Sequence, residues 1–319
     1  MMRVLVTGAA GYLGRLLLKE LAGFEAMATD LAFREPASNA RMHLCDIRKS
    51  DEVDTLFASF RPEAVVHLAS VVNPRRESRN LAFEVDVIGT RNILEACKKY
   101  GTRRLIVSSS GAAYGYHADN PVPLKESDPV RGNPEFPYSH HKRIIEEELA
   151  AHGKTGALPD LVIFRSGTIL GETTSNQITA LFHKPSLPGV KGSDSPFVFI
   201  WDMDAVGAIL RALAVQGDEF VAPAGVFNLA GDGWMTIDAM ATSLQVPVKR
   251  WPAWFLKALF AILRPLRLSR YGPEQVRFLQ YRPVLDNGKL KSEFGFLPQK
   301  SSLQTFEFYC RAHGIGSAK

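Results

Sequence analysis

Short apolar stretches alternate with segments of helical periodicity along the first half of this 319-residue chain, and this alternation constrains the fold more than any other feature. The expected strands are 3–8, 25–30, 42–45, 64–70, 103–110 and 161–167. The expected helices are 14–23, 50–60, 81–101 and one that begins near Tyr138. Strands that are apolar throughout must be covered on both faces. The sequence therefore predicts an α/β fold with a doubly wound parallel sheet.

A glycine-rich stretch, TGAAGYLG, follows the first expected strand and opens the first expected helix. In such a stretch Gly8 allows a tight turn, Gly11 lets the backbone approach a pyrophosphate, and Gly14 lets the helix pack against the strand. The helix N-terminus then offers unpaired amides to the phosphates. This position at the start of a βαβ series favours a Rossmann-type dinucleotide site over a glycine turn without a ligand.

Asp30 ends the second expected strand, about twenty residues after the glycine loop, which is the usual spacing of a ribose-binding acid. A carboxylate there accepts hydrogen bonds from the 2′-hydroxyl of an adenosine ribose and repels a 2′-phosphate. Asp30 therefore favours NAD over NADP. Arg34 is close enough to complicate this choice, and a solvated turn aspartate is the alternative interpretation of Asp30.

The regular alternation ends near residue 170. Two more strand–helix pairs are expected at 195–214 and 226–244, and the rest of the chain is richer in proline and aromatic residues. We therefore expect a dinucleotide-binding domain over 1–170, which also receives the strand–helix segments near 197–234. A smaller C-terminal substrate lobe would then comprise 171–319.

The composition excludes several classes of function. A net charge of +5 without a long basic block argues against nucleic-acid binding, and the short basic clusters at 73–79 and 98–104 are expected to be solvated surface. Three distant cysteines show no metal-ligand spacing and favour a reducing, cytoplasmic environment. We expect no metal site, no signal peptide before the first strand and no membrane-spanning segment.

Further motifs follow the glycine loop in a fixed order. They are CDIR at 45–48, HLAS at 67–70, SSSGAAYG at 108–115 and YSHHK at 138–142. With the glycine spacing and Asp30, they make the chain similar to the extended short-chain dehydrogenase/reductase family, and its 3β-hydroxysteroid dehydrogenase branch is favoured over the nucleotide-sugar epimerases. The resemblance covers the whole chain and is strongest over 1–170.

The resemblance implies a catalytic set of three residues. Tyr138 would be the general acid/base, and Lys142, one helical turn later, would bind the nicotinamide-ribose hydroxyls. Ser110, with Ser109 as second choice, would bind the reacting oxygen through its hydroxyl. We expect the Lys142 ammonium and the oxidised nicotinamide to lower the pKa of Tyr138 from its ordinary value of about 10.

The resemblance also assigns the cofactor contacts one residue at a time. His67 is tempting as a base, but we interpret it as a structural residue at a strand end. The expected cofactor-binding residues are Gly8, Gly11, Tyr12, Leu13 and Gly14 in the loop, Asp30, Asp46 and Ile47 at the adenosine, Leu68 and Ala69 beneath the cofactor, and Tyr138 and Lys142 at the nicotinamide ribose.

Several positions depart from the family pattern. His141 stands where serine is common before the lysine, and Asp86 stands where asparagine is common, so this cofactor-side contact is in doubt. Thr168 stands where sugar-nucleotide enzymes usually carry an asparagine that reaches the substrate. Aligning Asp204 on the family's aspartate places Phe197 where those enzymes have an arginine that clamps the substrate diphosphate.

Loss of these two polar anchors argues against a UDP-sugar and for a lipophilic or weakly charged alcohol or ketone. A different arginine, such as Arg131 or Arg211, could still serve a phosphate. Our first hypothesis is an NAD-dependent oxidoreductase that interconverts a secondary alcohol and a ketone. The alternatives are a sugar-nucleotide epimerase with tightly held NAD and a dinucleotide-sensing regulator without chemistry. A homodimer is an expectation of the resemblance only.

The segment 250–272 combines an apolar helical stripe with a basic edge. The apolar positions are Trp251, Trp254, Phe255, Leu256, Ala258, Leu259, Phe260, Ile262 and Leu263, and the basic ones are Lys257, Arg264, Arg267 and Arg270. We expect Pro265 to end or kink this helix. The favoured interpretation is a helix that docks on the second lobe and walls the substrate pocket. The alternative is a helix that lies in a membrane surface and meets anionic headgroups.

Overall fold

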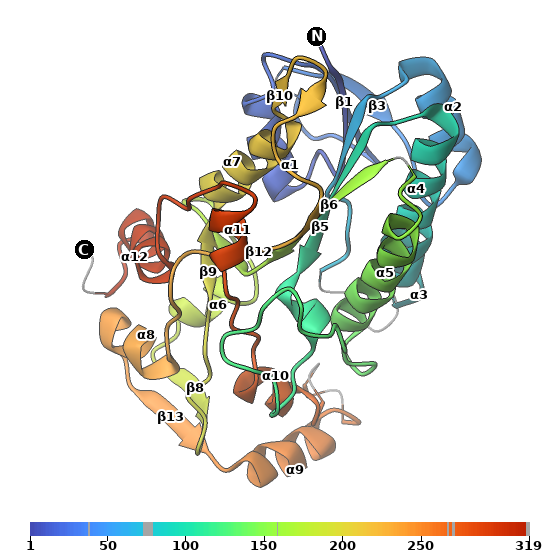
Figure 1. Ribbon diagram of the computed structural model, residues 1–319. Coiled ribbons are helices and arrows are strands. Elements are labelled where there is room, and N and C mark those ends of the chain that lie inside the picture. The colour runs from blue at the N-terminus through green and yellow to red at the C-terminus, as the bar shows by residue number, and fades with distance from the viewer. Residues whose placement is uncertain (38, 73–78, 158, 267, 270–271, 317–319) are drawn as a thin grey trace.

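Seven parallel strands form one central sheet in the computed structural model, which describes residues 1–37, 39–72, 79–157, 159–266, 268–269 and 272–316 (Figure 1). The strand order is β12-β6-β5-β4-β1-β2-β3. The bounds are β1 (Arg3–Thr7), β2 (Glu25–Asp30), β3 (Arg41–Leu44), β4 (Ala64–His67), β5 (Arg104–Ser110), β6 (Asp160–Ser166) and β12 (Gly225–Leu229). Because the order reverses between β1 and β4, their carboxyl ends flank the usual dinucleotide crevice.

Helices cover both faces of this sheet, as the apolar strands require (Figure 1). On one face lie α1 (Tyr12–Lys19) and α7 (Asp202–Leu213), whose Leu17 and Ile209 join the core. The other face is covered by α2 (Ser50–Phe60), α4 (Gly89–Tyr100) and α5 (Pro137–Gly153). The predicted doubly wound Rossmann-type fold is confirmed.

The helix expected over 81–101 is divided into three segments. It comprises α3 (Arg79–Phe83), a π-helical segment η2 (Glu84–Ile88) and α4. The π-helical segment contains Asp86, which is 1% exposed. A π-helical turn changes the side-chain directions of the residues that follow it, so the sequence periodicity could not place Asp86.

A second core lies beside the sheet domain and is built from the later part of the chain. Phe182, Phe199 and Phe306 pack against one another at its centre. Its elements are β7 (Thr168–Leu170), α6 (Thr179–Phe182), β8 (Leu187–Val190), β9 (Phe199–Trp201), α8 (Ile237–Leu244), β13 (Val248–Trp251), α9 (Ala253–Leu263), α10 (Gln275–Gln280) and α12 (Ser302–His313).

The segments near 197–234 are shared between the two cores. β12 is an edge strand of the central sheet, whereas β9 pairs with β7 in a separate two-stranded sheet. α11 (Gly288–Ser292) also returns to the first core, through Leu290. A small hairpin, β10 (Val215–Gln216) and β11 (Glu219–Phe220), connects α7 to β12. The predicted boundary at residue 170 stays a prediction.

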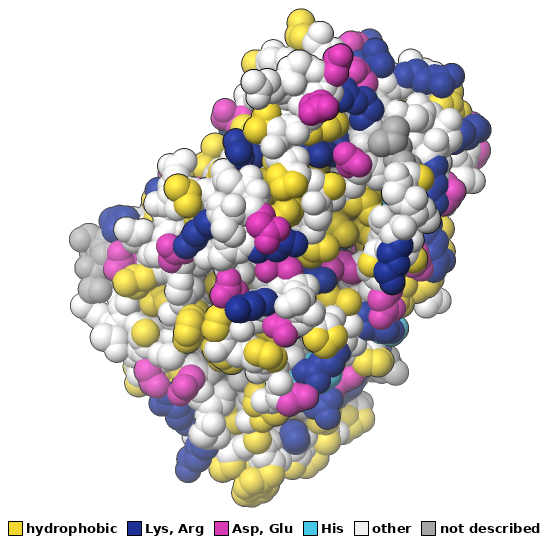
Figure 2. Space-filling view, in the orientation of Figure 1, with side chains coloured by type: hydrophobic (Ala, Val, Ile, Leu, Met, Phe, Trp, Pro, Cys, Tyr) yellow, Lys and Arg dark blue, Asp and Glu magenta, His cyan; other side chains and the backbone are white. Residues whose placement is uncertain are grey.

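Helix α9 docks on the second lobe by a narrow strip and exposes the opposite face. Leu256 is its buried residue and packs against Val190 and Val276. Trp254 is 72% exposed and Ile262 is 61% exposed. Hydrophobic side chains gather at the surface at the lower end of the molecule, where Figure 1 places α9 (Figure 2). The helix therefore has one docked face and one unpartnered apolar face within the described chain.

The cysteines Cys45, Cys97 and Cys310 are buried as free thiols. Among the described residues, no cluster of three or more histidine, cysteine or acidic side chains is arranged to hold a metal ion. No helix in the described ranges is both long and apolar enough to cross a membrane.

Candidate active site

The glycine loop turns tightly between β1 and α1. Gly8 has a φ of +67°, and a Cβ there would lie 2.6 Å from the backbone nitrogen of Ala69. A Cβ on Gly14 would lie 2.5 Å from the carbonyl oxygen of Gly8, so neither position accepts a side chain. Gly11 precedes α1, and no side-chain hydrogen bond caps the first amides of the helix. The loop therefore fits a dinucleotide pyrophosphate.

Tyr12 and Leu13, which follow the loop, direct their side chains elsewhere. The Tyr12 hydroxyl donates a hydrogen bond to Asp202 of α7 at 2.5 Å. Burial and this carboxylate raise the pKa of Tyr12 to about 12. Leu13 packs on the core of the first domain. The cofactor contact predicted for Tyr12 and Leu13 would therefore be made by their backbone amides.

Asp30 links the end of β2 to the glycine loop. Its Oδ2 accepts a hydrogen bond from the amide of Ala10 at 3.0 Å, and its Oδ1 accepts one from the amide of Leu31 at 2.8 Å. Each carboxylate oxygen keeps a second acceptor site, so Asp30 can also receive a ribose hydroxyl. Arg34, the complication expected from the sequence, has an exposed side chain.

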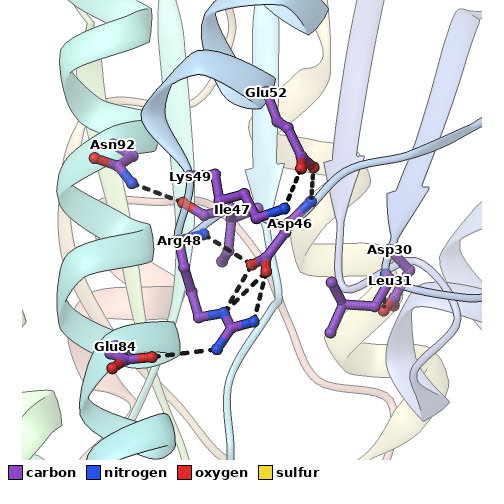
Figure 3. Close-up of polar contacts among 9 residues, drawn as sticks. All are labelled: Asp30, Leu31, Asp46, Ile47, Arg48, Lys49, Glu52, Glu84 and Asn92. Carbon is purple, nitrogen blue, oxygen red and sulfur yellow. Dashed lines mark hydrogen bonds and ion pairs between the residues drawn. The ribbon is translucent and has the colours of Figure 1, made fainter.

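Asp46 and Ile47, predicted to contact adenine, are held by their own neighbours (Figure 3). The carboxylate of Asp46 pairs with Arg48 at 2.6 Å, and Arg48 also pairs with Glu84 at 3.2 Å. The Arg48 guanidinium lowers the pKa of Asp46. The Ile47 carbonyl accepts a hydrogen bond from Asn92 at 2.8 Å, which fixes the backbone of the pair against α4.

Leu68 and Ala69, just after β4, lie directly against the Gly8 turn. A Cβ on Gly8 would lie within 2.8 Å of their backbone atoms. His67, one residue earlier, lies between Thr7 at 2.7 Å and Thr90 at 2.9 Å. Burial and, to a smaller extent, the charge of Lys142 lower the pKa of His67 to about 3. His67 is therefore neutral and has the structural role that we expected for it.

Ser110, Tyr138 and Lys142 come together at the carboxyl end of β5. Ser110 is the last residue of β5, and Tyr138 lies in the first turn of α5. The Ser110 hydroxyl accepts a hydrogen bond from the amide of Ala112 at 3.1 Å and lies near enough to the Tyr138 phenol to lower its pKa. The Lys142 ammonium donates to the Ser108 carbonyl at 2.7 Å and lies 5.5 Å from the centre of the Tyr138 ring. A helix thus places Lys142 one turn after Tyr138, as the spacing predicted.

Ser109, the second choice for the catalytic serine, points to the opposite face of the strand. Its hydroxyl donates a hydrogen bond to Glu146 on α5. Glu146 in turn pairs with Arg165 at 2.7 Å in a buried ion pair. Ser109 is therefore held by Glu146, whereas Ser110 is the serine that acts on the Tyr138 phenol.

The pKa of Tyr138 differs in direction from the sequence expectation. Burial and the charge of Asp86 raise it by more than Ser110 lowers it, and the resulting pKa is about 12. Burial also lowers the pKa of Lys142, against the charges of Asp86 and Glu146. For the protein groups alone, desolvation outweighs the effect of Ser110, and the lowering expected from Lys142 together with an oxidised nicotinamide stays a prediction.

Asp86 and His141, two of the departures from the family pattern, contact each other. The Nδ1 of His141 lies 2.8 Å from the Oδ2 of Asp86, and both side chains are buried. The other oxygen of Asp86 accepts hydrogen bonds from Ser70 at 2.9 Å and from the amide of Val71 at 2.8 Å. The pair therefore joins the segment after β4 to the start of α5, directly behind Tyr138 and Lys142.

Aromatic side chains lie next to Tyr138 on the side of the second lobe. Tyr116 packs edge-on against Phe136 at 5.0 Å and against Phe278 at 5.1 Å between ring centres. Phe136 immediately precedes α5 and is two residues before Tyr138. Phe197, at the position of the family's diphosphate arginine, is 1% exposed. The position predicted to lack that arginine is thus filled by a buried aromatic ring of the second core.

One arginine that was not expected from the sequence lies against Phe197. The guanidinium of Arg282 lies 3.8 Å from the centre of the Phe197 ring. The two arginines that we had considered are engaged elsewhere. Arg131 pairs with Asp119 at 2.8 Å, and Arg211 donates to the Phe294 carbonyl at 3.2 Å. No sequence signal could have found Arg282, because its contact with Phe197 joins segments that are distant in the chain.

Two further aligned residues belong to the scaffold. Asp204 is buried and accepts hydrogen bonds from the amides of Gln299 at 2.9 Å and Lys300 at 3.2 Å. It therefore ties α7 to the segment before α12. Thr168 starts β7, and its amide donates to the Val198 carbonyl at 3.0 Å.

Comparison with known proteins identifies relatives of two kinds. Uncharacterized protein Rv0501 of Mycobacterium tuberculosis is 27% identical over 98% of this chain and 84% of its own length. UDP-glucose 4-epimerase 2 of Oryza sativa subsp. japonica is 35% identical over 45% of this chain and 39% of its own length. Sterol-4-alpha-carboxylate 3-dehydrogenase erg26, decarboxylating, of Schizosaccharomyces pombe is 29% identical over 51% of each chain.

Solved structures share the fold over nearly the whole chain. The enzyme WbmG of Bordetella bronchiseptica, solved in complex with NAD, superposes with a TM-score of 0.75 at 21% identity, over 98% of this chain and 94% of its own. The sequence profile of the NAD dependent epimerase/dehydratase family matches residues 4–219. This chain therefore belongs to the NAD dependent epimerase/dehydratase family, whose members are NAD-dependent enzymes.

Proposed function

We propose that the protein is an NAD-dependent oxidoreductase that interconverts a secondary alcohol and a ketone on a mainly apolar substrate. The observation that carries this proposal is the grouping of Ser110, Tyr138 and Lys142 at the carboxyl end of β5, with Lys142 one helical turn after Tyr138. When bound, NAD supplies the acceptor or donor of the hydride. Only the proton and the developing charge on the substrate oxygen are then left to the protein.

Each of the three residues has one part in this reaction. Tyr138 takes the hydroxyl proton as the alcohol is oxidised and returns it in the reverse direction. The Ser110 hydroxyl donates to the reacting oxygen as negative charge develops there. Lys142 holds its ammonium on the Tyr138 side, where its charge favours the phenolate over the phenol. The charge of an oxidised nicotinamide would act in the same direction and oppose the effect of burial.

The aromatic side chains around Tyr138 support an apolar substrate. Tyr116, Phe136 and Phe278 pack edge-on beside the start of α5, and Phe197 replaces a phosphate-binding arginine. One relative is named for a sterol carboxylate, which is an apolar alcohol that carries one acidic group. These observations favour a lipid-like alcohol over a sugar nucleotide.

The second candidate is a sugar-nucleotide epimerase, in which the hydride returns to the other face of a transient ketone. It is favoured by the relative from Oryza sativa subsp. japonica, which has the higher identity over the matched segment. Such an enzyme would hold NAD tightly and not consume it. A regulator that binds the dinucleotide without chemistry is less well supported, because Ser110, Tyr138 and Lys142 are all present.

A screen of substrates distinguishes these candidates. The purified protein is mixed with NAD and a panel of sterols, aliphatic alcohols, hydroxy acids and UDP-sugars, and NADH is followed by absorbance. NADH that accumulates in proportion to an added alcohol supports the dehydrogenase. Interconversion of UDP-sugars without added cofactor, by protein that carries NAD through purification, would replace our proposal with the epimerase.

We also propose that α9 rests on an anionic membrane surface and that the protein is otherwise cytoplasmic. Trp254 and Ile262 expose apolar surface, and the exposed Lys249 and Lys257 flank it. α9 contacts α10, which carries Phe278 from the aromatic surface near Tyr138. A lipid-like substrate could thus pass from the bilayer toward the site. Arg267 and Arg270, part of the expected basic edge, lie outside the described residues. A homodimer stays a prediction.

A further inference from the structure

Arg282 is a cation without an anionic partner among the described residues. It follows α10 in the chain, and its guanidinium lies 3.8 Å from the centre of the Phe197 ring and 4.7 Å from that of Phe278. Its buried Nε has no hydrogen-bond partner. Its Nη1 reaches only the Leu279 carbonyl, at the long distance of 3.5 Å. The planar group is therefore stacked on aromatic rings while its donors lack acceptors.

This arrangement is unusual within the protein itself. Arg165, whose guanidinium lies 4.6 Å from the centre of the Tyr114 ring, also pairs with Glu146 at 2.7 Å. Arg104 is buried, but it donates to two carbonyls, at 3.0 Å and 2.8 Å. Burial lowers the pKa of Arg282 to about 9, against the smaller effect of Tyr116. A partly buried cation whose buried Nε lacks an acceptor is costly, and an incoming anion removes that cost.

Arg282 lies on the substrate side of the catalytic tyrosine. Tyr116 connects the two, because its ring packs against Phe278 under Arg282 and against Phe136 beside Tyr138. Burial raises the pKa of Tyr116, the charge of Tyr138 raises it further, and the charge of Arg282 lowers it. The ring contacts thus form a continuous chain from Arg282 through Phe278, Tyr116 and Phe136 to the start of α5, where Tyr138 lies.

We propose that Arg282 is the anion receptor of the substrate site and binds a carboxylate carried by an otherwise apolar alcohol or ketone. Aromatic rings cover the faces of the guanidinium, so its edge is left for two parallel hydrogen bonds to a carboxylate. One cation among aromatic side chains suits a monoanion better than a diphosphate. This role of Arg282 deepens the proposed function and rests on it for the identity of the reacting group, an alcohol or a ketone. Binding of the carboxylate can nevertheless be measured without turnover.

The test is isothermal titration of the full-length protein saturated with NAD. The probes are cyclohexanecarboxylate, its neutral isostere cyclohexanecarboxamide, and UDP as a phosphate-bearing probe. We expect the carboxylate to bind at least about tenfold more tightly than the amide. Arg282→Gln should abolish this difference, and Arg282→Lys, which keeps the charge without the fork, should keep part of it. Arg131→Gln is the matched control, because Arg131 is paired at the surface with Asp119, and should change nothing.

Three results would overturn the proposal. The first is equal affinity of the wild type for the carboxylate and the amide. The second is wild-type carboxylate affinity in Arg282→Gln, with melting temperature and NAD affinity retained, which would make Arg282 a structural cation on its rings. The third is UDP binding that exceeds carboxylate binding and is lost in Arg282→Gln. If Arg282→Gln does not fold, the affinities of Arg282→Lys for the carboxylate and the amide decide instead. A failed substrate screen would not alter these affinities.

Discussion

Asp86 and His141 replace two uncharged residues of the family pattern with one buried pair, 2.8 Å apart, behind the general acid/base. The charge of Asp86 raises the pKa of Tyr138 and that of Lys142. The carboxylate thus opposes the formation of phenolate while it helps Lys142 to stay protonated. At the scale of single residues, this pair is the clearest difference between the site and the pattern that predicted it.

Asp86→Asn tests this electrostatic effect. Loss of the negative charge lowers the pKa of Tyr138, so the phenolate that oxidation requires forms at lower pH. The pKa of Lys142 falls as well, so both limbs of the pH–rate profile should move to lower pH, by up to about one unit. The amide keeps the shape of the side chain and can still accept from Ser70. The measurement is kcat/KM for alcohol oxidation between pH 6 and pH 10, roughly the range in which such groups titrate.

The control for that profile is Glu95→Gln. Glu95 pairs with Lys98 on the exposed side of α4, so its substitution should leave the profile in place. A shift of Asp86→Asn to higher pH, or no shift while Glu95→Gln behaves as wild type, would show that Asp86 does not act on Tyr138 by charge.

Asp30 predicts the choice between the two dinucleotides. Its carboxylate is fixed by the amides of Ala10 and Leu31 and would face the adenosine ribose. A 2′-phosphate next to this carboxylate is repelled, so NAD should bind about tenfold or more tightly than NADP. Fluorescence titration of the apo protein with both dinucleotides measures the ratio. Equal or tighter binding of NADP would contradict the assignment.

At the scale of elements, the turn between β1 and α1 allows a matched pair of substitutions. Gly14→Ala places a methyl group 2.5 Å from the Gly8 carbonyl oxygen, so the loop must move. We expect NAD affinity to fall at least about tenfold, with a loss of stability of about 1–3 kcal/mol. In Gly23→Ala, just after α1, the new methyl group meets no atom within 4 Å. Its affinity and melting temperature should match wild type, and equal effects of the two variants would count against the loop's role.

Helix α9 carries the proposed membrane contact, and liposome co-sedimentation tests it. Wild-type protein should bind vesicles that contain anionic lipid at low salt and bind them less at physiological salt, because part of the attraction is electrostatic. Trp254→Ala/Phe255→Ala should weaken binding, since both side chains are exposed on the helix. Leu303→Ala, which removes an exposed leucine from α12, is the control. Absence of wild-type binding at low salt would leave α9 with the role of a pocket wall.

The sequence predicted the elements whose signals are local. The strands, the glycine loop and the i, i+4 spacing of Tyr138 and Lys142 depend on short segments, and the structure has them. The sequence could not predict the π-helical turn at Asp86, because the residues before and after this turn show the same helical periodicity. Nor could it predict the raised pKa of Tyr138 or the stacking of Arg282 on Phe197, since burial and long-range contacts exist only in the folded chain.

At the scale of the whole molecule, the reacting groups lie where the two cores approach each other. The sheet domain supplies the glycine loop, Ser110 and Tyr138, whereas the second lobe supplies Phe197, Phe278 and Arg282. A substrate held between them would have its hydroxyl at Tyr138 and its distal part at the lobe. Phe197 departs from the family pattern in the lobe, whereas Asp86 and His141 depart from it within the sheet domain.

The central claim is that Tyr138 moves the proton while the framework binds NAD, and the most direct measurement compares Tyr138→Phe with wild type. We predict that NAD affinity stays within about threefold, because the phenol oxygen is a small part of the cofactor site, while turnover of the alcohol identified by the screen falls by about two orders of magnitude or more. Turnover at the wild-type rate in Tyr138→Phe, with NAD bound normally, would contradict the account.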